Sequence, residues 1–159
     1  NEIAFLKKKF KNLKYNNLKK INLHTLKISE ISSQIAKKSS IRSVLKKYQI
    51  DFAKRNKNCC IEGRDISTKI LPYSNVKFFF ICNLNIAAKR RYKELKKQNF
   101  KLDLKEVKKA LRTRNLLDTK RKNSPLLKHS DSVVIDTGKL SKQAMLNKMS
   151  EHIERNFNN

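Results

Sequence analysis

Three short apolar runs, at residues 59–62, 76–82 and 132–135, constrain the fold of this 159-residue chain more than any other feature. Each run has the length of a strand, and the second and third runs are followed by stretches in which apolar residues have helical spacing. Apolar residues that are continuous instead of alternating are typical of strands covered on both faces. Strands that alternate with helices predict an α/β protein with a layered parallel sheet and right-handed crossover connections.

The sequence between these runs predicts the helices. Apolar spacing indicates two helices between residues 29 and 53 that meet near residues 38–40, one helix at 86–98, and a terminal helix from about 140 to 157. Asp103 and Glu106 form a capping pair, which predicts another helix start. The lysine-rich first 27 residues are compatible with either a basic amphipathic helix or an irregular connecting segment. We therefore divide the chain into a basic N-terminal segment, 1–28, and a domain, 29–159.

The net charge of +26, from 39 basic and 13 acidic residues, indicates a polyanionic partner: nucleic acid, a membrane surface or a phosphorylated ligand. A compositional origin explains the charge at least as well, because the lysines are spread over the whole chain. The charge alone therefore selects no function.

The cysteines and the apolar runs bear on the compartment. Cys59, Cys60 and Cys82 lie in apolar runs and lack metal-ligand spacing, so we expect buried free thiols in a reducing compartment and no metal site. No apolar run has the length of a membrane span, and no secretory signal is visible. We therefore expect a cytoplasmic location and no membrane partner.

Two clusters of arginine and aspartate carry the functional signal. Arg64 and Asp65 follow Gly63 at the end of the first predicted strand, the edge where open α/β sheets bind ligands. An Arg-Asp pair that only closes a turn would explain this cluster about as well as a ligand site. The second cluster has spacings of four and three residues, which place its members on one helical face: Arg114, Asp118 and Arg121. Surface ion pairs would explain it too, but arginine is scarce in this lysine-rich chain, which favours bidentate recognition of phosphate.

From about residue 29 to residue 153, these clusters belong to a longer ordered series. Its members are Ser33-Gln34-Ile35-Ala36, Ile41-Arg42, Glu62-Gly63-Arg64-Asp65, Lys77-Phe78-Phe79, Arg90-Arg91-Tyr92, Arg114, Asp118, Arg121, Pro125-Leu126 and Val134-Ile135-Asp136-Thr137. In order, spacing and context this series resembles bacterial cytidylate (CMP) kinase, over the later part of that family's usual length.

The resemblance implies a P-loop nucleoside monophosphate kinase with a three-layer parallel sheet. Such an enzyme transfers the γ-phosphoryl group of ATP, bound with Mg²⁺, to CMP or dCMP. The family's counterparts of Ser33, Arg42 and Asp65 recognise cytosine. This base has an acceptor edge beside an amino donor, so a wrong base leaves buried polar groups unpaired.

The resemblance also implies roles for the remaining arginines. Phosphoryl transfer requires positioning and cationic stabilisation of the phosphate oxygens. In the family, counterparts of Arg64 and Arg121 hold the acceptor phosphate, and counterparts of Arg114 and Asp118 reach the sugar and its surroundings. The catalytic candidates match the start of a mobile lid that closes over the transferring group: Arg90 and Arg91.

Two departures from the family pattern qualify this prediction. The phosphate-binding loop G-x-x-x-x-G-K-[ST] needs two glycines five apart, and the only glycines are Gly63 and Gly138. Asn115, Leu116 and Leu117 stand where the family usually has further acidic and basic residues. We therefore expect an N-terminally truncated cytidylate kinase that lacks its first strand and phosphate loop, has little activity alone, and retains in residues 1–28 a remnant of the acceptor-binding insert.

The complete enzyme is expected to be a monomer without a specific nucleic-acid partner. The alternative is a basic nucleic-acid-binding protein, such as a ribosome-associated factor, which the charge supports but no recognition module does. A third possibility, a degenerate relic without catalysis, would be expected to have lost the Arg/Asp site. Saturable, base-selective binding of a mononucleotide would distinguish the first two.

Overall fold

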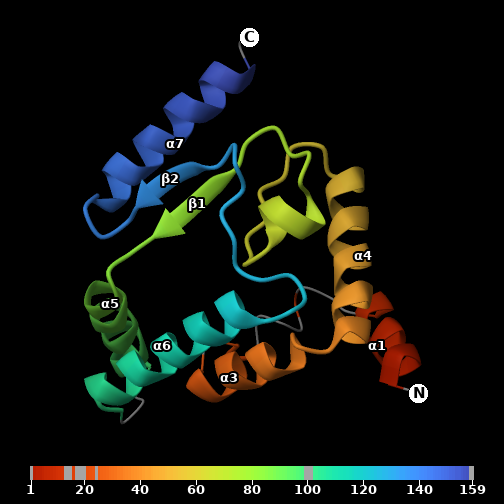
Figure 1. The fold of residues 1–159 in the computed structure, drawn as a ribbon, viewed down its shortest axis with the longest axis horizontal. Helices are drawn as coiled ribbons and strands as arrows, with labels where there is room; N and C mark the ends of the chain where they lie inside the picture. Colours follow the sequence, from red (N-terminus) through yellow and green to blue (C-terminus); the bar gives the residue numbers. More distant parts are fainter. Residues whose placement is uncertain (1, 13–15, 17–20, 24, 99–101, 158–159) are drawn as a thin grey trace.

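The computed structural model describes residues 2–12, 16, 21–23, 25–98 and 102–157 (Figure 1). Strands and helices both occur in the second half of the chain, and the described elements of the first half are helices joined by irregular segments. The elements are α1 (Glu2–Lys11), α3 (Leu26–Ile35), α4 (Ser39–Arg55), the π-helical turn η1 (Ile66–Ile70), β1 (Phe78–Ile81), α5 (Leu84–Lys97), α6 (Leu104–Lys120), β2 (Val133–Asp136) and α7 (Lys142–Phe157).

The sheet consists of β1 and β2, which run parallel with Phe78 opposite Val133 and Ile81 opposite Asp136. The crossover between them contains α5 and α6, which pack against each other. On one side of the sheet α7 lies along the two strands (Figure 1), and the ring of Phe78 contacts that of His152 on α7 at 5.8 Å between centroids. The predicted α/β class with a parallel sheet is confirmed.

The strand predicted at residues 59–62 is wrong. This segment is irregular, and Cys59 and Cys60 are exposed, while Cys82 is half-buried. An extended segment becomes a strand only when a neighbour supplies the ladder hydrogen bonds, and among the described residues β1 pairs with β2 alone. The prediction of buried thiols is therefore wrong for the vicinal pair.

The predicted helices before and after this segment are confirmed. α3 ends and α4 begins around residues 36–38, and the Thr25 hydroxyl caps α3 by accepting a hydrogen bond from the Ile28 amide at 3.1 Å. Asp103 and Glu106 form the expected capping box of α6, in which the Asp103 amide donates to Glu106 Oε2 at 3.0 Å.

The N-terminal segment is helical over α1, one of the two possibilities left open by the sequence. This helix packs on α4, where the rings of Phe10 and Tyr48 stack at 5.2 Å and Tyr48 donates a hydrogen bond to the Lys7 carbonyl. Leu13 and Leu18, two of the apolar positions behind the prediction, lie outside the described residues.

The buried core is small; besides Ile135 of β2, which is fully buried, it has two centres. Leu95 and Val107 close the contact between α5 and α6, and Ile41 and Val44 of α4 are buried near Ile70 of η1. Between these centres α3 lies beside α6 (Figure 1). This places the end of α3, the end of α6 and the turn before η1 next to one another. Among the described residues, no helix combines the length and apolar character needed to cross a membrane.

Candidate anion-binding pocket

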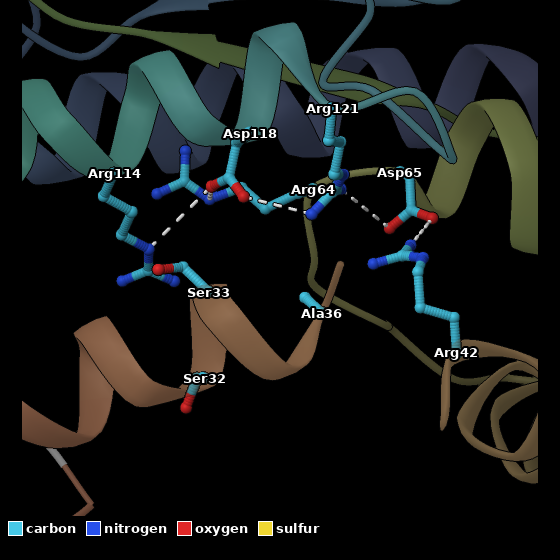
Figure 2. Close-up of a pocket in the computed structure, with 9 residues that line it drawn as sticks. All are labelled: Ser32, Ser33, Ala36, Arg42, Arg64, Asp65, Arg114, Asp118 and Arg121. Carbon is cyan, nitrogen blue, oxygen red and sulfur yellow. Dashed lines mark hydrogen bonds and ion pairs between the residues drawn. The ribbon is translucent and has the colours of Figure 1, made fainter. Parts of the chain in front are cut away.

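A pocket of about 140 Å³ opens where α3, α6 and the turn before η1 meet (Figure 2). It is smaller than the usual site for a whole ligand, so it can enclose the charged part of one. Its lining is dominated by arginine, aspartate and serine, and consists of Ser32, Ser33, Ala36, Arg42, Arg64, Asp65, Arg114, Asp118 and Arg121. The four arginines exceed the two aspartates by two positive charges.

The turn before η1 presents Arg64 and Asp65. The Asp65 carbonyl begins the π-helical turn by accepting from the Ile70 amide at 3.3 Å and also accepts from the Lys69 amide at 2.9 Å, which fixes the backbone behind the carboxylate. Gly63 is required by close packing: a Cβ there would come within 2.7 Å of Ile66 Cγ1. The sequence Gly-Arg-Asp therefore lets the chain pass close to Ile66 and still direct two charged side chains into the pocket.

The end of α6 contributes the second cluster. Arg114 and Asp118 lie one turn apart on the face of α6 that borders the pocket, as their spacing predicts. Arg121 is the C-cap, just beyond the helix, and its Nη1 donates to Asp118 Oδ1 at 3.0 Å. Its Nε donates to the carbonyl of Ser124, a residue with a left-handed φ of 54°. The chain reverses there, and the Leu126 amide donates to the Asp118 carbonyl at 2.8 Å, which holds this end of the helix in place.

Asp118 is the centre of the ion pairs at one end of the pocket. Its Oδ2 lies 3.3 Å from Arg64 Nε and 3.9 Å from Arg114 Nε, while its Oδ1 pairs with Arg121. The side chain is only 5% exposed. One buried carboxylate thus holds three guanidinium groups in one place.

Asp65 is the centre at the other end. Its Oδ2 forms an ion pair with Arg42 Nη2 from α4, and its Oδ1 lies 3.7 Å from Arg121 Nη2. Arg121, with a side chain 6% exposed, therefore links the two carboxylates (Figure 2). Ser33, also buried, lines the pocket beside Arg114 (Figure 2) and donates its hydroxyl to the Glu30 carbonyl at 2.8 Å.

The electrostatics of the pocket favour an anion. Burial lowers the pKa of Arg64, the neighbouring charge of Arg114 lowers it further, and Asp118 opposes both. Burial, and then the charge of Arg42, likewise lower the pKa of Arg121. Two buried atoms, Asp118 Oδ2 and Arg121 Nη2, have no hydrogen-bond partner among the described residues. The site thus combines crowded positive charge with a guanidinium nitrogen, Arg121 Nη2, that donates no hydrogen bond within the described residues, while Asp118 Oδ2 is held by its ion pairs with Arg64 and Arg114.

Seven residues singled out from the sequence line this one pocket: Ser33, Arg42, Arg64, Asp65, Arg114, Asp118 and Arg121. The two lid candidates do not line it. Arg90 Nη2 donates to the Thr137 carbonyl at 2.8 Å, beyond the end of β2, and Arg91 Nη1 pairs with Glu94 at 2.7 Å along α5. Their catalytic role stays a prediction.

Sequence reasoning missed four residues at the pocket. Ala36 belongs to the series quoted from the sequence and lies three residues after Ser33, which could have indicated it, whereas Ser32 directly precedes Ser33 and its spacing does not indicate it. Ser29 and Asn115 accept hydrogen bonds from two of the pocket arginines, across 85 and 51 residues of sequence. No local signal in the sequence indicates these two contacts.

The residues that the structure describes contain no group of three or more His, Cys, Asp or Glu side chains that could hold a metal ion. The arginine-rich donor set of the pocket does not suit Mg²⁺, which prefers oxygen ligands. No chemical step is therefore assigned to a metal within this chain.

A parallel α/β arrangement with four arginines around two buried carboxylates is typical of proteins that bind a small phosphorylated molecule. The family model for cytidylate kinase matches residues 2–155, and the chain belongs to the cytidylate kinase family. This confirms the resemblance and favours it over a basic nucleic-acid-binding protein.

Relatives within this family are cytidylate kinases of Rickettsia. That of Rickettsia akari (strain Hartford) is 36% identical over 134 residues, which cover 84% of this chain and 61% of the relative. That of Rickettsia africae (strain ESF-5) is 38% identical over 144 residues, covering 91% of this chain and 65% of the relative. The chain thus spans less than two thirds of the length of the relatives it matches.

Proposed function

We propose that this chain forms the acceptor-nucleotide region of a cytidylate kinase. The intact protein would transfer the γ-phosphoryl group of ATP to CMP or dCMP. The observation that carries the proposal is the pocket itself, in which the seven candidate residues converge from α3, α4, α6 and the turn before η1. Family membership supports the reaction, and the geometry supports the division of roles given below.

The end of the pocket around Asp118 suits the phosphate. Arg64, Arg114 and Arg121 surround one carboxylate, so their combined charge exceeds what that carboxylate neutralises. Guanidinium groups bind phosphate oxygens through pairs of parallel N–H donors. Arg121 Nη2, which donates no hydrogen bond within the described residues, supplies a donor for a phosphate oxygen.

The end around Asp65 suits the base. A carboxylate accepts from the exocyclic amino group of cytosine, and a guanidinium donates to its acceptor edge. Asp65 and Arg42 are already held together as an ion pair, with Ser33 lining the same pocket. Uracil carries a carbonyl where cytosine carries the amino group, so it would face the Asp65 carboxylate with an acceptor and lose this pairing.

Fewer residues of this chain can be proposed to bind ATP than to bind the acceptor nucleotide. Its two glycines cannot form the phosphate-binding loop, so the residues that would hold ATP and Mg²⁺ are not assigned here. Arg90 and Arg91 remain candidates for a lid that would close over the transferred group. The monomeric state and cytoplasmic location of the complete enzyme also stay predictions.

The test is base-selective binding measured by isothermal titration calorimetry on the 159-residue chain. CMP is expected to bind saturably, at least about tenfold more tightly than UMP or AMP, a difference of about 1.4 kcal/mol. Asp65→Asn and Arg42→Ala are expected to reduce this selectivity to about threefold or less. Equal affinities for CMP and UMP in the unaltered chain would refute the base assignment.

A further inference from the structure

The segment that joins α4 to the pocket carries two adjacent exposed thiols. Cys59 and Cys60 are both exposed, whereas Cys82, just beyond β1, is half-buried. Because consecutive α-carbons are about 3.8 Å apart, the chain itself keeps these two sulfur atoms near each other. An oxidant that reaches one thiol therefore has a second thiol within the same segment, which a single exposed cysteine does not provide.

The backbone of this segment is unpaired, but its two ends are fixed. Within the described part of the chain, no backbone hydrogen bond joins residues 57–62 to a neighbour. At one end the Asn56 amide donates to the Phe52 carbonyl at 3.0 Å and closes α4. At the other end Gly63 packs against Ile66 with no room for a Cβ. The segment can thus change conformation at low cost, and such a change acts on the turn that carries the pocket residues.

Vicinal thiols react with a small disulfide in two steps. One thiolate attacks a sulfur of the small disulfide, forms a mixed disulfide and releases one small thiol; the adjacent thiolate then attacks the mixed disulfide and releases the second. The protein loses two hydrogen atoms, which the two released thiols carry. Disulfides usually join α-carbons about 4.4–6.8 Å apart, so a bond between adjacent residues is strained and easily reduced. Such a bond suits transient oxidation in a reducing compartment.

The charges beside the thiols favour an anionic oxidant. Lys54, Arg55 and Lys57 precede the pair and are exposed, and the first acidic residue after them is Glu62. A local excess of positive charge raises the local concentration of an anionic reactant and the rate of its encounter. A low-molecular-weight disulfide that carries carboxylate groups meets this requirement.

We propose that Cys59 and Cys60 form a redox site outside the pocket, which an anionic low-molecular-weight disulfide oxidises reversibly to a vicinal disulfide. Its formation displaces the turn that carries Arg64 and Asp65. The site goes beyond the proposed kinase function and does not depend on it.

Mass spectrometry of the 159-residue chain treated with glutathione disulfide tests the site. The unaltered chain and Cys82→Ser are both expected to lose two hydrogen atoms, to retain no glutathione, and to recover on reduction with dithiothreitol. Cys60→Ser is expected to stop at one glutathione adduct on Cys59, because it lacks the second thiol. If the unaltered chain also stops at glutathione adducts, or if its disulfide includes Cys82 or joins two chains, the site is overturned.

The preference for an anionic oxidant is tested by the rate of oxidation. Lys57→Gln is expected to slow the reaction with glutathione disulfide about threefold and to leave the reaction with the neutral bis(2-hydroxyethyl) disulfide unchanged. Lys148→Gln, which removes an exposed charge from α7, is the matched control and should change neither rate. Equal effects of Lys57→Gln on the two oxidants would overturn the electrostatic preference.

The effect on the turn is measured without any nucleotide. In the ¹⁵N-labelled chain, oxidation is expected to shift the amide signals of Arg64 and Asp65 and to leave that of His152 on α7 unchanged. If the vicinal disulfide forms and the two turn signals do not move, the coupling to the pocket is overturned. Because none of these measurements uses CMP, failure of the reduced chain to select CMP would overturn the proposed function alone.

Discussion

Two regions of the molecule differ in how their side chains are paired or covered: the pocket between α3 and α6, and the two-stranded sheet. In the pocket, two buried carboxylates and four arginines from separate elements pair with one another. In the sheet, Phe80, Ile81 and Val134 are 49%, 43% and 39% exposed, and among the described residues β1 has one strand neighbour. Parallel strands usually have both faces covered. The charged side chains of the pocket are therefore largely paired with one another, whereas the sheet leaves apolar side chains exposed.

The largest expected effect of a substitution is at the centre of the pocket. Asp118→Asn leaves Arg121, and partly Arg64 and Arg114, without their buried counter-charge, so the free energy of unfolding should fall by about 3 kcal/mol or more. Urea denaturation followed by circular dichroism measures this change. The control is Glu2→Gln, which removes one member of an ion pair with Lys38 in which both side chains are more than half exposed, so the loss should be much smaller. Equal losses in the two variants would show that the pocket network does not stabilise the fold.

In the sheet, a change should alter association more than stability. Phe80→Lys removes an apolar ring beside the open edge of β1 and adds a charge, which disfavours edge-to-edge pairing between molecules. Sedimentation velocity at increasing concentration should show less self-association, with the free energy of unfolding changed by about 1 kcal/mol or less. Phe157→Lys, which alters an exposed ring at the end of α7, is the matched control. If both variants lower association equally, the sheet edge has no special part in it.

The smallest expected effect concerns the three cysteine thiols. Cys59 and Cys60 are exposed and should react with Ellman's reagent in the folded chain about tenfold faster than half-buried Cys82. In Cys82→Ser the slow phase should disappear and the fast phase should be unchanged. Reaction of all three thiols only after unfolding would contradict the structure and restore the sequence-based prediction of buried cysteines.

The sequence could predict the pocket residues better than the strands, because the two depend on different kinds of contact. Arg64, Asp65, Arg114 and Asp118 were identifiable because residue type and local spacing determine their direction once the turn and α6 form. The strand at residues 59–62 was not predictable from its own composition, since a strand depends on a neighbour elsewhere in the chain.

The contacts of the pocket arginines with Ser29 and Asn115 were also beyond sequence reasoning. Each joins residues more than fifty positions apart, so it depends on how α3 and the turn before η1 pack against α6. Neither serine nor asparagine carries a local signal that indicates a long-range partner. Such contacts become visible only when the packing of the helices is known.

The central claim is that the Arg/Asp pocket, and not the sheet or the basic helix α1, receives the acceptor nucleotide. The most direct measurement is a titration of the ¹⁵N-labelled chain with CMP, followed by amide chemical shifts. We predict saturable shifts at Arg64, Asp65 and the end of α6, with Phe80, Val134 and α1 unchanged. Shifts confined to α1, or shifts that grow without saturation over the whole surface, would contradict the account and indicate non-specific attraction of an anion to a basic protein.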